Sequence, residues 1–397
     1  MYDTSLTPKI IEKLQTAKRP VLMLGTGVRL SGAHKEVLLL AEKLQIPVVT
    51  AWNAHDVIAD EHPLYCGRPG TVGLRGGNFV VQNSDLLFVL GCRLNIRQIS
   101  YSYKRFAPDA YKIIVDIDEK ELQKPTIKPN LPINANLKDV VEDMLKQYLP
   151  EMPAKWLEWC TQIHQKYPAV LPSYYEKTDI LNPYVFIKEF TQGLREDDVM
   201  VCGNGSACVI TFQAAIVKKC QRLFTNSGCA TMGYGFPAAI GVSFAQNKRI
   251  ICFDGDGSFQ MNIQELQTLV YHNLNVKIIY LNNSCYLSMK QTQINLFEPP
   301  LIGISKESGV SFPDAEKIAK AYGVPFMRVK TIQDIDALQK FIEKDGPAFC
   351  EIIIDPSQNF EPKLSSKVLP DGRIVSPEID DMFPFLSREE YEKNKRV

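Results

Sequence analysis

Two short apolar segments, each running into polar residues, constrain this sequence most strongly. Residues 250–253 lead into a Gly-Asp-Gly turn at Asp256, and residues 277–281 lead into a pair of asparagines that ends at Asn283. Between them, apolar residues recur at helical spacing from 260 to 273, which predicts a strand–helix–strand unit. Parallel strands of such a unit end at the same edge of the sheet. We therefore expect Asp256 and Asn283 side by side, where open α/β sheets bind ligands.

The turn carries the groups that a metal diphosphate needs. Its glycines, Gly255 and Gly257, let the backbone approach phosphate oxygens, and the following helix offers free N–H groups at its positive end. The Asp256 carboxylate and the Asn283 amide oxygen suit Mg²⁺, which keeps few protein ligands and takes the rest from phosphate and water. Ser258 closes the turn and is expected beside the phosphates. The pattern predicts a magnesium–diphosphate site.

A calcium loop is the alternative interpretation of this turn. The residues at loop positions 1, 3, 5 and 12 would be Asp254, Asp256, Ser258 and Glu265. Position 6 must be glycine for the sharp turn, but it is Phe259 here. Strands rather than helices also lead into the turn. For Asp256 alone, a helix cap is the structural alternative, and its pairing with Asn283 favours the metal ligand.

Composition excludes several functions. Lysine plus arginine equals aspartate plus glutamate at 45 each, so nothing favours a nucleic-acid or anionic-membrane partner. Ten cysteines form no Cys-x-x-Cys pair, which is typical of reduced, buried thiols, and five scattered histidines disfavour a zinc site. The chain opens without a basic, then apolar stretch, and no run reaches membrane-spanning length. We therefore expect a soluble cytoplasmic protein.

Alternating strands and helices predict the α/β fold class, with two doubly wound parallel-sheet domains. A Rossmann-like domain is expected over 1–150, a linker over 151–180, a second domain over 181–358 and a tail over 359–397. The first domain has predicted strands at 21–24, 47–50, 86–90 and 113–116, and helices at 34–44 and 137–149. The second begins at Asn182-Pro183, a cap followed by proline. Its predicted strands are 199–202, 222–225, 250–253, 277–281, 325–329 and 349–354. The tail is expected to drape over a neighbour.

The turn and the asparagine pair, at this separation, resemble the signature of thiamine-diphosphate enzymes. The segment 231–241 resembles the one that carries a hydrophobic prop under the cofactor. Gly203-Asn204-Gly205-Ser206 resembles the upstream diphosphate loop. In overall appearance the sequence is similar to the acetolactate synthase group, including relatives in surface-sugar biosynthesis. Three motifs in the right order predict thiamine diphosphate and Mg²⁺ as cofactors.

The resemblance assigns further roles around the metal. The third protein ligand in the family is a main-chain carbonyl two residues after the second asparagine, here that of Cys285. A thiol at this position is harmless because the main chain makes the bond. Tyr286 and Leu287 follow it and are expected to contact the cofactor.

Met232 is the residue to which the resemblance assigns a catalytic effect. It stands where the family places a bulky side chain that bends the cofactor, which brings the 4′-amino group against C2 of the thiazolium ring. Core packing is the alternative role for this methionine. The main-chain carbonyl of Ala230 would bind the amino group, with Thr231 beside it.

The first domain resembles the part of acetolactate synthases that binds FAD, which serves no redox role there. Gly25-Thr26-Gly27 resembles a dinucleotide turn without its third glycine, and segments 67–71, 91–93 and 116–118 resemble other parts of that region. Other family members keep the domain and have lost the flavin. FAD therefore stays open, with ordinary turn chemistry at strand ends as the alternative.

Family members of full length begin with another α/β domain, whose glutamate protonates the aminopyrimidine ring of the cofactor. This sequence starts where the middle domain is expected, so the resemblance covers about two of three domains. No glutamate here can be given that role. Active sites in the family form between subunits. We therefore expect a homo-oligomer (dimer or tetramer), a separate chain that carries the pyrimidine-binding domain, or a remnant that binds cofactor poorly.

The resemblance implies a carboligase or decarboxylase acting on a 2-oxo acid such as pyruvate, with the cofactor as electron sink. Acetolactate synthases usually carry a tryptophan nine residues after the second asparagine, and Thr292 stands there, which puts branched-chain amino-acid synthesis in doubt. The polar run 290–293 favours a larger hydroxylated acceptor such as a nucleotide-linked keto sugar, with a solvated loop as the alternative. A non-catalytic cofactor-binding subunit is the rival function. A Rossmann-type oxidoreductase is disfavoured by the incomplete glycine fingerprint.

Overall fold

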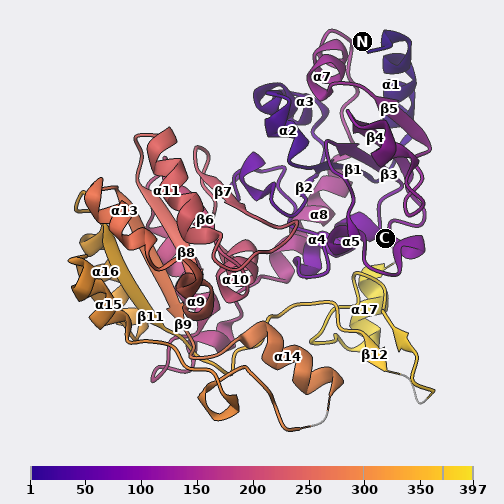
Figure 1. Cartoon of the computed structure of the whole chain (residues 1–397). Coiled ribbons are helices and arrows are strands. Elements are labelled where there is room, and N and C mark those ends of the chain that lie inside the picture. Colours follow the sequence, from indigo (N-terminus) through magenta and orange to yellow (C-terminus); the bar gives the residue numbers. More distant parts are fainter. Residues whose placement is uncertain (1, 298, 369–370, 396–397) are drawn as a thin grey trace. The chain divides into compact units, whose positions relative to one another are not determined.

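The computed structural model describes residues 2–297, 299–368 and 371–395 (Figure 1). The chain divides into two compact units: unit 1 is Met1–Ala169 with Glu361–Val397, and unit 2 is Val170–Phe360. Each unit contains one parallel sheet, of five strands in unit 1 and six in unit 2. This confirms the predicted fold class. Among the described residues, no helix is long and apolar enough to cross a membrane.

Unit 1 is a sheet covered by helices on both faces. Its strand order is β2-β1-β3-β4-β5, with every pair parallel. Leu22 and Phe88 belong to one apolar cluster, whereas the adjacent Met23 and Val89 belong to another. Because these strands are buried on both faces of the sheet, their sequences are uninterrupted apolar runs. The strands are β1 (Pro20–Leu24), β2 (Val48–Thr50), β3 (Leu86–Leu90), β4 (Tyr111–Asp116) and β5 (Leu131–Asn134). The helices of this part are α1 (Thr7–Thr16), α2 (Gly27–Leu30), α3 (His34–Leu44), α4 (Arg75–Gln82), α5 (Ile96–Ile99), α6 (Glu119–Gln123), α7 (Leu137–Leu145) and α8 (Ala154–Lys166).

The C-terminal segment 361–397 packs on helix α4 of unit 1. Asn78 donates a side-chain hydrogen bond to the carbonyl of Ile379 at 2.9 Å, and Arg75 donates to that of Met382 at 3.1 Å. Ile379 and Met382 are buried. The segment contains β12 (Lys367–Val368), β13 (Ile374–Val375) and α17 (Arg388–Lys395). It is thus held by its own chain, in a region where the sequence suggested a tail over a neighbour.

Unit 2, like unit 1, is built on one parallel sheet. Its strand order is β10-β11-β9-β8-β6-β7, again with every pair parallel. Asn182 caps the first helix by accepting from the Tyr184 N–H at 2.9 Å. The strands are β6 (Val199–Cys202), β7 (Arg222–Thr225), β8 (Ile250–Gly255), β9 (Val276–Asn282), β10 (Phe326–Val329) and β11 (Ala348–Ile353). The helices are α9 (Pro183–Gln192), α10 (Ser206–Ala214), α11 (Gly235–Ala245), α12 (Asp256–Phe259), α13 (Glu265–Tyr271), α14 (Leu287–Leu296), α15 (Ala315–Tyr322) and α16 (Ile335–Ile342).

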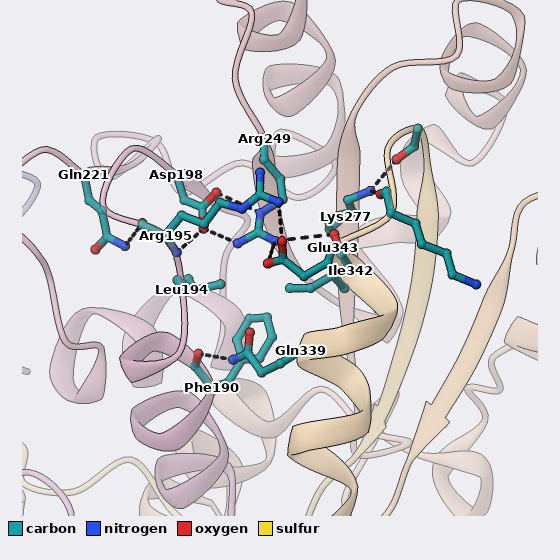
Figure 2. A network of polar contacts seen from close by, with 12 residues as sticks. Phe190, Leu194, Arg195, Asp198, Gln221, Arg249, Lys277, Gln339, Ile342 and Glu343 are labelled. Carbon is teal, nitrogen blue, oxygen red and sulfur yellow. Dashed lines mark hydrogen bonds and ion pairs between the residues drawn. The ribbon is translucent and has the colours of Figure 1, made fainter.

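Polar contacts tie together the strand ends of unit 2 opposite the Gly-Asp-Gly turn (Figure 2). Arg249, just before β8, donates two hydrogen bonds to Asp198, just before β6, at 2.8 and 2.6 Å, and a third to Glu343 at 2.6 Å. The Arg249 and Asp198 side chains are 2% and 0% exposed. Removing one partner of such a buried pair costs about 3–5 kcal/mol because the other charge stays buried. The pair therefore holds the N-terminal ends of β6 and β8 together. The loops that follow these strands extend from their C-terminal ends.

Candidate functional site

The structure brings Asp256 and Asn283 together at the C-terminal edge of the unit 2 sheet. Strands β8 and β9 are adjacent and parallel, with Gly255 opposite Leu281. Asp256 begins α12, and its Oδ2 accepts a hydrogen bond from the Asn283 backbone N–H at 3.2 Å. The two positions that the sequence pattern paired are therefore in direct contact.

The Asp256 carboxyl is buried, and its hydrogen-bond donors are backbone N–H groups. Its Oδ1 accepts from the Gly257 N–H at 2.8 Å. Burial raises the pKa of Asp256 to about 7, although the N–H groups of Gly257 and of residues 283–285 favour the ionised form. A nearby cation would favour ionisation and lower this pKa. A buried carboxyl that lacks a counter-charge fits a site for a cation.

The donor set suits Mg²⁺ rather than a metal held by many acidic side chains. Among the described residues, no three His, Cys, Asp or Glu side chains gather where they could hold a metal ion. One carboxylate with amide and carbonyl oxygens leaves most of the shell to phosphate and water, which is how Mg²⁺ is usually bound. The calcium-loop alternative fails on the same evidence. Its position 6, Phe259, is a core residue that is 1% exposed.

The residues after Asn283 form a tight turn into α14. The Asn283 Oδ1 accepts from the Cys285 N–H at 3.2 Å, and Ser284 has a positive φ of 53°. The Cys285 carbonyl, expected as a metal ligand, accepts from the Leu287 N–H at 3.1 Å, so one of its two lone pairs is already used. The Tyr286 ring lies against the Gly-Asp-Gly turn, because a Cβ on Gly257 would be 2.0 Å from a ring carbon.

The segment 203–206 forms an open cradle at the start of α10. Gly205 is the N-cap residue, with φ 57° and ψ −132°, a conformation that favours glycine. A Cβ there would meet no atom within 4 Å, so this side of the loop is open. Ser206 is the first residue of the helix. The free N–H groups and positive end of a helix suit a phosphate. The loop therefore fits a diphosphate group.

The segment 230–234 is hydrogen-bonded to both of these loops. Its residue Ala230 has a positive φ of 52°, and its carbonyl accepts from the Asn204 side chain at 3.2 Å. The Gly233 N–H donates to the Ser258 hydroxyl at 2.9 Å. Met232 between them is half-buried, and Thr231 is exposed. The three motifs of the sequence thus form one connected structure at one sheet edge.

Asp254 is a buried residue of this edge to which the sequence pattern gave a role only in the rejected calcium loop. It is 0% exposed, and its Oδ1 accepts from the Gly255 N–H at 3.0 Å. Burial raises its pKa to about 7, opposed by the Ser258 hydroxyl and the N–H groups of Gly255 and Phe236. A strand otherwise made of apolar residues was the available signal, because a charged residue inside such a run needs an explanation.

The polar run 290–293 lies on α14, and its side chains are largely engaged within unit 2. Gln291 donates to Asn359 at 2.8 Å, Thr292 donates to the Ser288 carbonyl at 3.0 Å, and Gln293 donates to Ile302 and accepts from it. An open surface depression of about 280 Å³ is lined by Ser288, Met289, Thr292 and Gln293. The run is therefore neither a solvated loop nor a row of free polar groups.

In unit 1, the segments that resemble a flavin region serve internal packing. A Cβ on Gly25 would lie 2.2 Å from the Gly91 carbonyl oxygen, and one on Gly27 would lie 2.7 Å from the Gly91 Cα. Gly70 exchanges hydrogen bonds with the Asn78 side chain. Asp118 caps α6. These glycines are explained by close backbone approach, and they leave no open cradle comparable with that at Gly205.

Comparison with known sequences agrees with this geometry. The family model described as "Thiamine pyrophosphate enzyme, central domain" matches residues 7–144, and "Thiamine pyrophosphate enzyme, C-terminal TPP binding domain" matches residues 203–352. Together the two matches cover most of the chain. The chain therefore belongs to the thiamine pyrophosphate enzyme family, as the sequence motifs predicted.

Acetolactate synthase large subunits are among the proteins similar to this chain. The chain is 32% identical over 353 residues to "Acetolactate synthase isozyme 1 large subunit" of Escherichia coli (strain K12), which covers 88% of this chain and 61% of that protein. It is 32% identical over 372 residues to "Probable acetolactate synthase large subunit" of Methanococcus aeolicus, covering 88% and 60%. The large subunit of Lactococcus lactis is 29% identical over 373 residues, covering 92% and 63%. The chain spans about three fifths of the length of these relatives.

Proposed function

We propose that unit 2 binds thiamine diphosphate through Mg²⁺ and that the chain works as the cofactor-binding part of an acetolactate synthase-like carboligase or decarboxylase. The contact between Asp256 and Asn283, beside the open glycine cradle at Gly205, carries this proposal. Bound thiamine diphosphate supplies an electron sink for decarboxylation of a 2-oxo acid such as pyruvate. The chain's own residues hold and orient that group.

Each segment of the edge has a task in this proposal. Asp256, Asn283 and the Cys285 carbonyl hold the metal, while the cradle 203–206 and the turn 255–258 receive the diphosphate. Tyr286 and Leu287 wall the site. Met232 supports the ring system from a segment that is fixed by hydrogen bonds, which favours one bent geometry of the cofactor.

The acceptor is proposed to enter beside α14. The open depression of about 280 Å³ has a mainly apolar lining that includes Met289, with hydroxyl groups of Ser288 and Thr292 and the amide of Gln293 at its border. Threonine in place of a tryptophan leaves space for a larger, hydroxylated acceptor, and a keto sugar is the class that we favour. Thr292 and Gln293 already make hydrogen bonds within unit 2, which limits the hydrogen bonds that they can offer to an acceptor.

Association with another subunit or with a pyrimidine-binding domain is part of the proposal. Large apolar side chains around α11 and α13 are exposed: Phe244 at 58%, Met261 at 53% and Tyr271 at 77%. Exposed apolar groups near one another are typical of surfaces that bind a partner. Of these, Met261 lies against Gly233 of the segment 230–234, which supports a shared active site.

Calorimetric titration with thiamine diphosphate tests the central claim. We expect the wild-type chain to bind the cofactor when Mg²⁺ is present and to bind it at least about tenfold more weakly after chelation, because the diphosphate then loses its bridging cation. Thiamine without phosphates serves as the matched control and should give no Mg²⁺-dependent heat. Equal affinity with and without Mg²⁺ would refute the proposed site.

We propose that unit 1 binds no flavin, so we expect purified protein to be colourless. The side of Gly25 and Gly27 that a Cβ would occupy is taken by the backbone of Gly91, so packing within unit 1 accounts for both glycines. Absorbance between 300 and 500 nm after gel filtration, with and without prior incubation with FAD, measures this directly (about the range of oxidised flavin absorption). Yellow protein that keeps its flavin through the column would show that the turn opens.

A further inference from the structure

The Asp254 carboxyl is buried at the cofactor edge, and one of its oxygens lacks a well-formed hydrogen bond. Its Oδ1 accepts from the Gly255 N–H, whereas no donor reaches Oδ2 with normal distance and angle. The Ser258 hydroxyl and the Phe236 N–H still favour the ionised carboxyl. A buried acceptor left unpaired costs about 1–3 kcal/mol. Such a group in a folded protein is uncommon and calls for a specific cause.

The space around this carboxyl is made by two distant glycines. A Cβ on Gly203 would lie 2.3 Å from Asp254 Oδ1, and a Cβ on Gly235 would lie 3.1 Å from Oδ2. The same Cβ on Gly235 would be 2.8 Å from the Gly203 Cα. Asp254, Gly203 and Gly235 therefore touch one another closely, with no room for a methyl group at position 203.

Each of the three residues belongs to a different cofactor segment. Gly203 opens the cradle 203–206, Gly235 follows the segment that carries Met232, and Asp254 leads into the turn of Asp256. Gly235 is also the first residue of α11, so the carboxyl lies at the positive end of an 11-residue helix. A negative group is stabilised there.

We propose that Asp254 is a positioning residue that sets the spacing of the three cofactor-binding segments. It touches neither the metal nor the diphosphate in this assignment and acts through Gly203 and Gly235. The inference rests on the proposed thiamine diphosphate site. An apolar side chain of similar size would fill the same space but could neither accept a hydrogen bond nor carry a negative charge at the start of α11.

The first test compares Asp254→Asn with Cys252→Ala. Asparagine keeps the size of the side chain but removes its charge, and we expect cofactor affinity at saturating Mg²⁺ to fall by about 10–100-fold, as for other residues that orient ligands. Cys252 lies two residues earlier on the same strand face and is also 0% exposed. Its truncation should lower the melting temperature and leave cofactor affinity unchanged.

The second test is a double-mutant cycle between positions 203 and 254. Gly203→Ala should weaken binding to a measurable degree, because its methyl group collides with the carboxyl. Adding Asp254→Ala removes that collision, so the double variant should bind at least as tightly as Gly203→Ala alone. Gly203→Ala combined with Cys252→Ala should show additive losses, as expected of independent sites.

The outcomes separate this inference from the proposed function. If wild-type chain fails to bind thiamine diphosphate with Mg²⁺, the proposed function is wrong. If the wild type binds and Asp254→Asn binds equally well, the positioning role is wrong and the cofactor site stands. Additive losses for positions 203 and 254 would likewise overturn the positioning role.

Discussion

Replacing Asp256 by alanine is expected to abolish Mg²⁺-dependent binding of thiamine diphosphate while the fold survives. The change removes the one carboxylate of the proposed metal site. Residues that merely orient metal ligands already contribute about 10–100-fold to affinity, so loss of the ligand itself should exceed this range. Calorimetry with cofactor and Mg²⁺ on both proteins measures the difference.

The stability of the ligand-free protein should respond differently from cofactor affinity. The Asp256 carboxyl is buried without a cationic partner, and ionisation there is unfavourable enough to raise its pKa to about 7. Its removal relieves that burial but leaves the Gly257 and Asn283 N–H groups without this acceptor, so the melting temperature should change little. Wild type should gain stability when cofactor and Mg²⁺ are added, and the variant should not.

Asp355 provides a matched control at the same sheet edge. It follows β11, is 5% exposed, and is already paired with Lys177 at 3.1 Å and with Ser357. Asp355→Ala should lower stability because it leaves these donors unpaired, and it should leave cofactor affinity intact. Equal affinity of wild type and Asp256→Ala would sink the assignment of the metal site.

Local patterns located most strands of the two large sheets. Apolar runs bounded by polar turns located β3 and β6 to the residue, because strands buried on both faces tolerate no interruption. The edge strand β7, in which buried and half-buried residues alternate, was also located to the residue. The strand β5 was missed. Its exposed residues are Pro132 and Asn134, and proline is tolerated there because β5 lies at the edge of the sheet.

Helix boundaries depended on contacts that the sequence does not show. One helix was predicted over 260–273, but the chain forms α12, a 3-10 turn over Gln260–Asn262 and then α13. The Asn262 side chain donates to the Gly233 carbonyl at 2.7 Å, so the segment 230–234 stabilises the interruption between α12 and α13. The predicted helix over 137–149 ends at Leu145. The packing of segment 361–397 on α4 likewise depends on partners about 300 positions away.

Some features of the candidate site could be predicted from the sequence, and others depend on contacts between distant residues. Asp256 and Asn283 could be paired from sequence because parallel strand ends share an edge. The role of Asp254 could not be predicted in this way, because it depends on contacts with Gly203 and Gly235, which are distant in sequence. The polar run on α14 looked free, but whether Gln291 or Gln293 has a partner is decided by residues 302 and 359.

The 397-residue chain alone is expected to release no carbon dioxide from pyruvate above the rate of free cofactor. Full-length family members are expected to supply a glutamate that protonates the aminopyrimidine ring, and the residues assigned to the cofactor here include none. The matched family models describe the central and C-terminal domains. A ring amino group without that carboxylic acid is a poor base for the reacting carbon.

Adding a polypeptide that carries the pyrimidine-binding domain of a full-length relative should restore turnover. Positioned acid–base groups contribute about 10²–10⁴-fold to rate, so the gain should be unmistakable in a carbon dioxide assay. Two controls isolate the cause: the added domain with its glutamate changed to glutamine, and this chain with Asp256→Ala. Both should remain at background while the two polypeptides still associate.

The pattern of results decides between an enzyme and a binding subunit. Restored turnover that depends on both the added glutamate and Asp256 supports a shared active site. Tight cofactor binding and stable association without turnover would support a non-catalytic subunit instead. Rapid carbon dioxide release by the chain alone would contradict the argument from the glutamate, because some group of this chain would then have to act as the acid at the pyrimidine ring.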